Sequence, residues 1–187
     1  STATMGSLFE DDARDVEIVT LDEHLRLVPG VMSHVFCSGV KPVFELQLAS
    51  GRTVTASANH PFLTLDGWVH LGDLAVGGHV AASRHDGPEI DPRRDSIPRE
   101  VWDYIERKSL VVSGSLRAHD LIERLGEEAG GAHRVYEQGV SRSLMGRIAE
   151  ALSDPFLDDL GVSDVLWDEI VAIEPLVAPA LIIMGVP

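Results

Sequence analysis

The 187-residue chain has a formal net charge of −15 and a hydrophobic content of 44%, which is ordinary for a globular protein. This length predicts one compact domain that carries an insertion, because two full-size domains would be crowded. The negative charge argues against non-specific binding of nucleic acid, which depends on Lys and Arg displacing the counterions of phosphates.

Short strands separated by turns are predicted between Val16 and Ser83. Residues that favour strands cluster or alternate in four segments, at 16–20, 25–28, 40–48 and 52–56. Residue pairs typical of turns separate these segments, namely Asp22-Glu23, Ser38-Gly39, Ser50-Gly51 and Asp66-Gly67. Strands spaced this closely predict a mainly β body.

Helical spacing replaces this pattern between His85 and Asp164. Pro98 suits the first turn of a helix that runs towards Lys108. Ser141 suits the N-cap of another helix, which Asp154-Pro155 ends. Apolar residues mark one face of these two helices and of a third between them: Val101, Ile105, Leu121, Ile122, Leu125, Leu144, Ile148 and Leu152. A strand is predicted to return at 165–173.

The segment from Ser57 to Trp68, which reads Ser-Ala-Asn-His-Pro-Phe-Leu-Thr-Leu-Asp-Gly-Trp, resembles the second conserved block of inteins. The runs at 39–48, 51–55 and 71–78 are similar to the inteins of actinobacterial replicative DNA helicases (DnaB), of the mycobacterial type. The resemblance implies a Hint fold, a horseshoe-like β fold with an inserted small α-helical region. It also implies autocatalytic protein splicing as the family activity.

The resemblance divides the chain into three parts. Residues 1–84 would form the N-terminal part of the splicing domain, and 85–164 a helical insert in the place of an endonuclease. Residues 165–187 would form a truncated or divergent C-terminal part, of which 165–175 is similar to the approach to the last family blocks. The insert contains 10 Lys and Arg against 17 Asp and Glu, a net charge of −7, so the alternative of a DNA-binding endonuclease remnant is disfavoured.

The resemblance also implies roles for three residues of the second block. The peptide bond is a poor electrophile, so attack on it needs proton transfer to the leaving nitrogen and donors for the oxyanion. His60 would supply the proton, while Ser57 and Asn59 would orient the scissile bond. The alternative interpretations are a structural His60 that packs against Pro61 and Trp68, and a Ser57 hydroxyl that caps a backbone group.

The two ends of the sequence depart from the family pattern. The segment Met5-Gly-Ser-Leu8 is similar to a part of the family that follows the first block, which would place Ser1 in a turn and not at the nucleophile position. No Asn follows Asn59, so the terminal cyclisation of splicing has no reactant. We therefore expect no splicing by this chain alone. It would need flanking extein segments or a companion intein fragment, or would serve as a non-catalytic binding module that a partner completes.

The remaining features predict little further chemistry. Cys37 is interpreted as a partly buried residue at a turn, and Phe62 and Trp68 as core. The His residues show no metal-ligand spacing, and no glycine-rich phosphate loop is present, so we expect no metal, no cofactor and no helicase ATPase core. A single Cys, no secretion signal and no apolar run of about 20 residues favour a cytoplasmic protein without a membrane partner.

Overall fold

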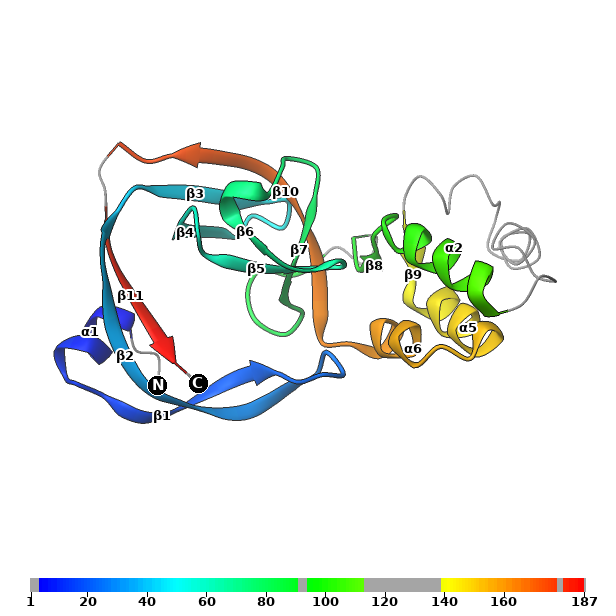
Figure 1. Ribbon diagram of the computed structural model, residues 1–187, viewed down its shortest axis with the longest axis horizontal. Coiled ribbons are helices and arrows are strands. Elements are labelled where there is room, and N and C mark those ends of the chain that lie inside the picture. The colour runs from blue at the N-terminus through cyan, green and yellow to red at the C-terminus, as the bar shows by residue number, and fades with distance from the viewer. Residues whose placement is uncertain (1–3, 91–93, 113–138, 178–179, 187) are drawn as a thin grey trace. The chain divides into compact units, whose positions relative to one another are not determined.

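The computed structural model describes residues 4–90, 94–112, 139–177 and 180–186 (Figure 1). The chain divides into two compact units. Unit 1 takes its residues from 1–63, 68–78 and 169–187, and unit 2 from 64–67 and 79–168. Strands dominate unit 1, whereas the longer helices lie in unit 2. None of the helices in the described ranges is long and apolar enough to cross a membrane.

A long hairpin opens unit 1. Strand β1 (Arg14–Leu21) pairs antiparallel with the first half of β2 (Leu27–Lys41). Asp22 closes the connection, because its Oδ1 atom accepts the backbone N–H groups of His24 at 2.9 Å and of Arg26 at 2.8 Å. A short side-chain carboxylate that bonds nearby N–H groups holds a tight turn, which is the turn that Asp22-Glu23 predicts. A short helix, α1 (Met5–Glu10), precedes the hairpin.

The second half of β2 pairs with β11 (Ala180–Val186), so the strand order is β1-β2-β11. His34 is paired on both sides, with Arg14 of β1 and with Val186 of β11. A Cβ atom added to Gly185 would overlap the sulfur of Met32, which explains the Gly inside this strand. The sequence analysis assigns no secondary structure after residue 175, and β11 adds a strand there.

A second group of strands in unit 1 centres on β3 (Val43–Leu48). One edge of β3 pairs with β4 (Thr53–Ser57), and the other pairs with the C-terminal half of β10 (Val165–Pro175). Pro42 lies between β2 and β3, because it lacks an N–H group and interrupts the single strand that was predicted for 40–48. The buried apolar residues of unit 1 are Met32, Val35, Val43, Leu46, Leu48, Ala56, Leu71 and Ile170.

Short elements follow β4. Strands β5 (Pro61–Thr64) and β6 (Gly67–His70) form a two-stranded ribbon, and the 3₁₀ turn η1 (Leu71–Asp73) comes directly after it. Thr64 closes the turn of the ribbon, since its hydroxyl donates to the carbonyl of Gly67 at 2.8 Å. The Ser57–His60 segment therefore connects β4 to β5, and η1 comes after the ribbon of β5 and β6.

Unit 2 contains β7 (His79–Ser83), β8 (Ser96–Ile97), α2 (Val101–Val112), β9 (Val140–Ser141), α5 (Arg142–Leu152) and α6 (Pro155–Val162). The predicted cap of α5 is confirmed, because the Ser141 hydroxyl accepts the N–H of Leu144 at 3.3 Å. The helix predicted around Leu121 lies outside the described residues. Asp154 begins α6, which the sequence pattern did not predict; its carboxylate accepts the N–H of Phe156 at 3.0 Å.

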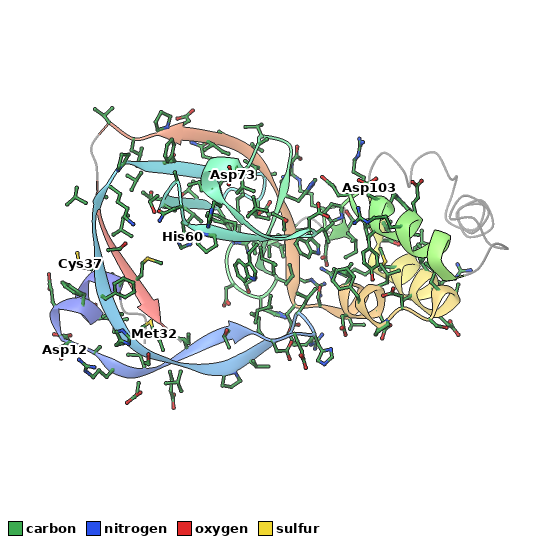
Figure 2. The ribbon with its side chains drawn as sticks, in the orientation of Figure 1. Asp12, Met32, Cys37, His60, Asp73 and Asp103 are labelled. Atoms are coloured by element: carbon green, nitrogen blue, oxygen red, sulfur yellow. The ribbon has the colours of Figure 1, made fainter. Side chains whose placement is uncertain are left out.

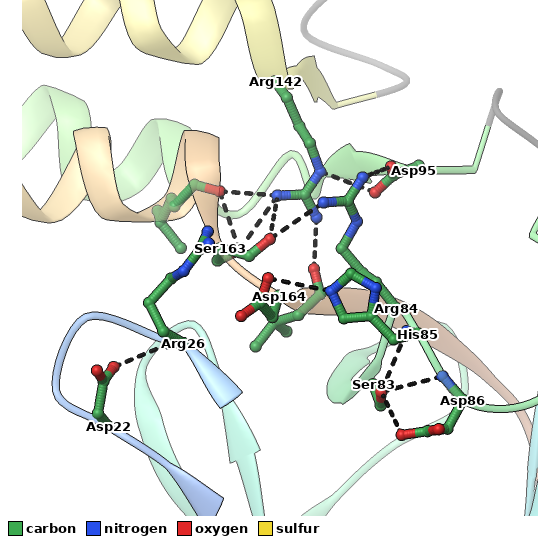
Figure 3. Close-up of polar contacts among 12 residues, drawn as sticks. Asp22, Arg26, Ser83, Arg84, His85, Asp86, Asp95, Arg142, Ser163 and Asp164 are labelled. Carbon is green, nitrogen blue, oxygen red and sulfur yellow. Dashed lines mark hydrogen bonds and ion pairs between the residues drawn. The ribbon is translucent and has the colours of Figure 1, made fainter. Parts of the chain in front are cut away.

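Arg142 organises the polar contacts of unit 2 (Figure 3). Its Nε atom donates to Asp95 at 2.8 Å, and its Nη1 atom donates to the carbonyl of Leu160 at 3.0 Å and to the hydroxyl of Ser163 at 3.1 Å. Its Nη2 atom donates to the carbonyl of Val165. The first turn of α5 is thereby tied to the end of α6 and to the beginning of β10.

Candidate functional site

The three residues predicted for the site lie where β4 ends, with Ser57 as its last residue and Asn59 and His60 on the turn that leads to β5. The Ser57 hydroxyl donates to Asn59 Oδ1 at 2.8 Å, and the His60 N–H donates to the Ser57 carbonyl at 2.9 Å. Ser57 is buried, with 5% of its surface exposed, whereas Asn59 and His60 are exposed. The turn thus presents an amide and an imidazole to solvent above a buried hydroxyl.

The bond between Ser57 and Asn59 fixes which atoms of the amide remain available. The Asn59 oxygen accepts the Ser57 hydroxyl, so the two N–H groups of the same amide stay free to donate elsewhere. The Ser57 hydroxyl uses its one hydrogen in this contact. Ser57 can therefore act on a substrate through Asn59 more readily than by direct donation.

Two backbone hydrogen bonds join this segment to residues of the 3₁₀ turn η1; Figure 2 labels His60 of the segment and Asp73 of η1. The N–H of Leu71 donates to the His60 carbonyl at 2.9 Å, and the N–H of Gly72 donates to the Ala58 carbonyl at 2.8 Å. A Cβ atom on Gly72 would lie 3.4 Å from Ala58, so the two segments approach closely there. The sequence reasoning did not assign Leu71 and Gly72 to the site, although their run is part of the family resemblance.

The His60 ring is partly exposed and makes an aromatic contact. Its centroid lies 5.2 Å from that of Phe62, with the ring planes at 69° in an edge arrangement. Burial by the neighbouring groups lowers the pKa of His60 below its ordinary value of 6.5, because the imidazolium form loses hydration. The neutral imidazole therefore predominates at pH 7, and it can accept a proton at one nitrogen while carrying one at the other.

Two sequence expectations near the site are wrong. Trp68 was predicted to be core, yet 70% of its surface is exposed on β6. Cys37 was predicted to be partly buried at a turn, but it is exposed and lies within β2 (Figure 2). Burial depends on which strands pack together, and the local sequence does not determine that.

Other groups add no chemistry at this turn. Within the described ranges, no cluster of three His, Cys, Asp or Glu side chains has the arrangement of a metal site. His79 instead contacts Glu100 at 3.2 Å, and His85 contacts Asp164 at 3.1 Å, both inside unit 2. Ser1 lies outside the described residues.

Residues 1–181 match the family described as "Intein splicing domain". A segment of 74 residues is 43% identical to the replicative DNA helicase DnaB of Synechocystis sp., covering 39% of this chain and 8% of that protein. A segment of 61 residues is 43% identical to DnaB of Nostoc sp., covering 33% of this chain and 7% of that protein. The chain thus spans less than a tenth of the length of these helicases.

The fold also has a relative of known structure. The crystal structure of a DnaB intein from Synechocystis sp. superposes with a TM-score of 0.52 at 22% identity. The match covers 98% of this chain and 74% of that chain. At this low identity the match is evidence for the fold alone. The superposition confirms the mainly β, Hint-type fold that the sequence predicts.

Proposed function

This chain belongs to the intein splicing domain family, and we propose that its Ser57–His60 turn assists cleavage of a peptide bond in the first step of protein splicing. The observation that carries the proposal is an exposed His60 that directly follows an exposed Asn59 whose side-chain oxygen accepts the Ser57 hydroxyl. Burial also lowers the pKa of His60. The backbone N–H and carbonyl of His60 are both hydrogen bonded, which fixes the position of the backbone from which the imidazole extends. A catalytic group needs such a preorganised position.

The proposed step moves one proton and exchanges one bond. The side chain of the residue at the upstream junction gives its proton to the neutral His60 ring as its oxygen or sulfur attacks the carbonyl carbon. The resulting imidazolium gives that proton to the leaving nitrogen as the C–N bond breaks, which leaves an ester or thioester. The Asn59 N–H groups stabilise the oxyanion between these events, and Ser57 holds the Asn59 amide in orientation.

Later steps of splicing need groups from outside these 187 residues. Asn59 is the only Asn in the sequence and belongs to the turn itself, so a cyclising Asn must come from a flanking or companion segment. We infer that the 187 residues by themselves do not ligate flanking segments. The proposed setting is a cytoplasmic DnaB-type replicative helicase, and an actinobacterial host of the mycobacterial type stays a prediction.

The test places the 187 residues between two reporter domains. One fusion contains these residues alone, and the second adds to both ends the terminal segments of the Synechocystis DnaB intein. We expect mass spectrometry to find ligated reporters for the second fusion only. In the completed fusion, His60→Ala should slow upstream cleavage by about 100-fold or more, the usual contribution of general acid–base catalysis. Ligation by the 187 residues alone, or an unchanged rate in His60→Ala, would contradict the proposal.

A second candidate function is a binding module that a companion strand completes. Its support is the edge of β2: among the described strands, none pairs with residues 27–33 on the side where β11 pairs with 34–41. Unpaired N–H and C=O groups on such an edge bind an added strand. A DNA-binding role for the insert has no such support, since its net charge is −7.

A further inference from the structure

The His60 backbone and the His60 ring are restrained to different degrees. The backbone donates to Ser57 and accepts from Leu71, both at 2.9 Å. Among the described residues, no hydrogen bond holds either ring nitrogen, although the proposed proton transfer requires the ring to keep one orientation. A free imidazole on a fixed backbone still rotates about two side-chain bonds. Some other contact must therefore set its orientation.

Phe62 supplies that contact. The two rings meet edge to face, with their centroids 5.2 Å apart and their planes at 69°. This arrangement is favoured because the positive edge of one aromatic ring meets the negative face of the other. His60 immediately precedes β5 and Phe62 is the second residue of that strand, and alternate residues of an extended chain project to the same side. Pro61 between them limits backbone rotation.

The position of Phe62 fits a supporting role. Phe62 is partly buried, whereas His60, Asn59 and Pro61 are exposed, so the Phe62 ring lies deeper than the groups it would support. The ring contact makes no hydrogen bond to an imidazole nitrogen among the described residues. A hydrogen-bonding support would instead occupy one of the two nitrogens that the proton transfer uses.

We propose that Phe62 is a positioning residue, whose ring fixes the orientation of the His60 imidazole for proton transfer. The inference rests on the proposed catalytic function of His60. The contact between the two rings can still be tested without any splicing activity. Phe62 does not touch the reacting atoms; it acts through His60. The contact also removes water from one side of the imidazole, in keeping with the lowered pKa of His60.

The test is a proton NMR titration of the His60 ring in the full 187-residue chain. In Phe62→Leu, which keeps an apolar side chain and removes the ring, the His60 ring-current shift should disappear and the titration midpoint should rise. Phe62→Tyr should restore both values to those of the parent chain. The matched control is Phe156→Leu, which disrupts the ring contact with Tyr104 at 4.9 Å in unit 2 and should leave the His60 titration unchanged.

Several outcomes separate the possibilities. An unchanged His60 shift and midpoint in Phe62→Leu would overturn the positioning role. If Phe62→Leu does not fold, as judged by circular dichroism, Phe62→Met provides the same comparison with a flexible side chain of similar volume. In the completed reporter fusion, Phe62→Leu should shift the pH profile of upstream cleavage towards the new midpoint. If His60→Ala leaves the cleavage rate unchanged there, the proposed function fails while the NMR result on Phe62 still stands.

Discussion

The hydroxyl of buried Ser57 donates to the side-chain oxygen of exposed Asn59 at 2.8 Å, so the two polar residues of the turn form one unit. Sequence reasoning treats both as independent candidates to orient a peptide bond. The contact gives them different roles, because it occupies the Ser57 proton and the Asn59 oxygen and leaves the Asn59 N–H groups available. The two residues should therefore respond differently to substitution.

Ser57→Ala should reduce upstream cleavage in the completed reporter fusion while it lowers the free energy of unfolding by only about 1 kcal/mol, the usual net value of one hydrogen bond. Because Asn59 is exposed, water can donate to its side-chain oxygen in place of the Ser57 hydroxyl, which limits the loss of stability. Water does not hold the amide in one orientation. Ser57→Thr keeps the hydroxyl and is the matched control, with cleavage close to that of the parent. Urea unfolding and a cleavage time course measure the two effects. Equal cleavage in Ser57→Ala and Ser57→Thr would contradict the role.

The pH dependence of stability should carry a signature of His60. Its pKa in the folded chain lies below the unfolded value near 6.5, so the unfolded chain binds more protons between these two values. Stability should therefore rise with pH through that window and level off above it. His60→Ala removes the difference, so the variant should show a flatter curve just below pH 6.5 in urea titrations. A variant curve that parallels the parent across this window would show that His60 is not the source.

The Arg142 contacts should be a major source of stability in unit 2. Arg142→Met leaves Asp95 with Arg84 as its remaining ion-pair partner, and it removes donors from the carbonyls of Leu160 and Val165. Because Asp95 keeps one partner, the cost comes mainly from the lost hydrogen bonds of a charged donor and should be about 2 kcal/mol or more. Arg147→Met, which changes an exposed Arg on the same helix, is the control and should cost below about 1 kcal/mol, the usual limit for an exposed charged contact. Similar losses of unfolding free energy in both variants would exclude this role for Arg142.

Local signals in the sequence predicted the parts of the fold that depend on neighbouring residues. The Asp22 turn and the Ser141 cap each involve bonds that span four residues or fewer. Helix α6 was missed although its signal is present, because Asp154-Pro155 was interpreted only as the end of α5. Asp154 at the N-cap with Pro155 at the first helical position is the usual beginning of a helix.

The wrong predictions concern properties that long-range packing decides. Cys37 pairs with Ile183 of β11, which lies nearly 150 positions later in the sequence, and no local pattern foretells that partner. Trp68 lies on a two-stranded ribbon, and 70% of its surface is exposed because little of the described chain packs against its side chain. The predicted division of the chain at residues 84 and 164 stays a prediction.

Deletion of residues 88–160, with a flexible linker in their place, should leave unit 1 folded. Strands β1, β2, β3, β4 and β11 pair among themselves and take no residue from the deleted segment. The deletion removes Trp102, which has 5% of its surface exposed, and leaves exposed Trp68 as a larger share of the tryptophan emission. We expect a cooperative unfolding transition together with red-shifted tryptophan emission. Loss of the cooperative transition would show that the helices belong to the core of unit 1.

A companion strand should bind the chain along the open edge of β2. Strand β11 pairs with residues 34–41 of β2, and its last pair is Val186 with His34. Among the described strands, none therefore pairs with residues 27–33 on that side of β2. A peptide with the sequence of a first intein block supplies the missing donors and acceptors, and its alternate side chains add contacts with one face of the sheet.

Such binding should raise the melting temperature of the chain in proportion to occupancy, with about 2.7 kcal/mol of stabilisation at a ligand concentration 100 times Kd. The matched control is the same peptide with N-methylated residues at alternate positions, which cannot complete the ladder of hydrogen bonds.

His60→Ala should keep the thermal shift, because the proposed role of His60 is proton transfer and its side chain is exposed. Equal shifts with both peptides would show binding without strand addition, and no shift well above micromolar peptide would show that the edge accepts no strand. Loss of folding in His60→Ala would make His60 a structural residue and would remove the basis of its catalytic role.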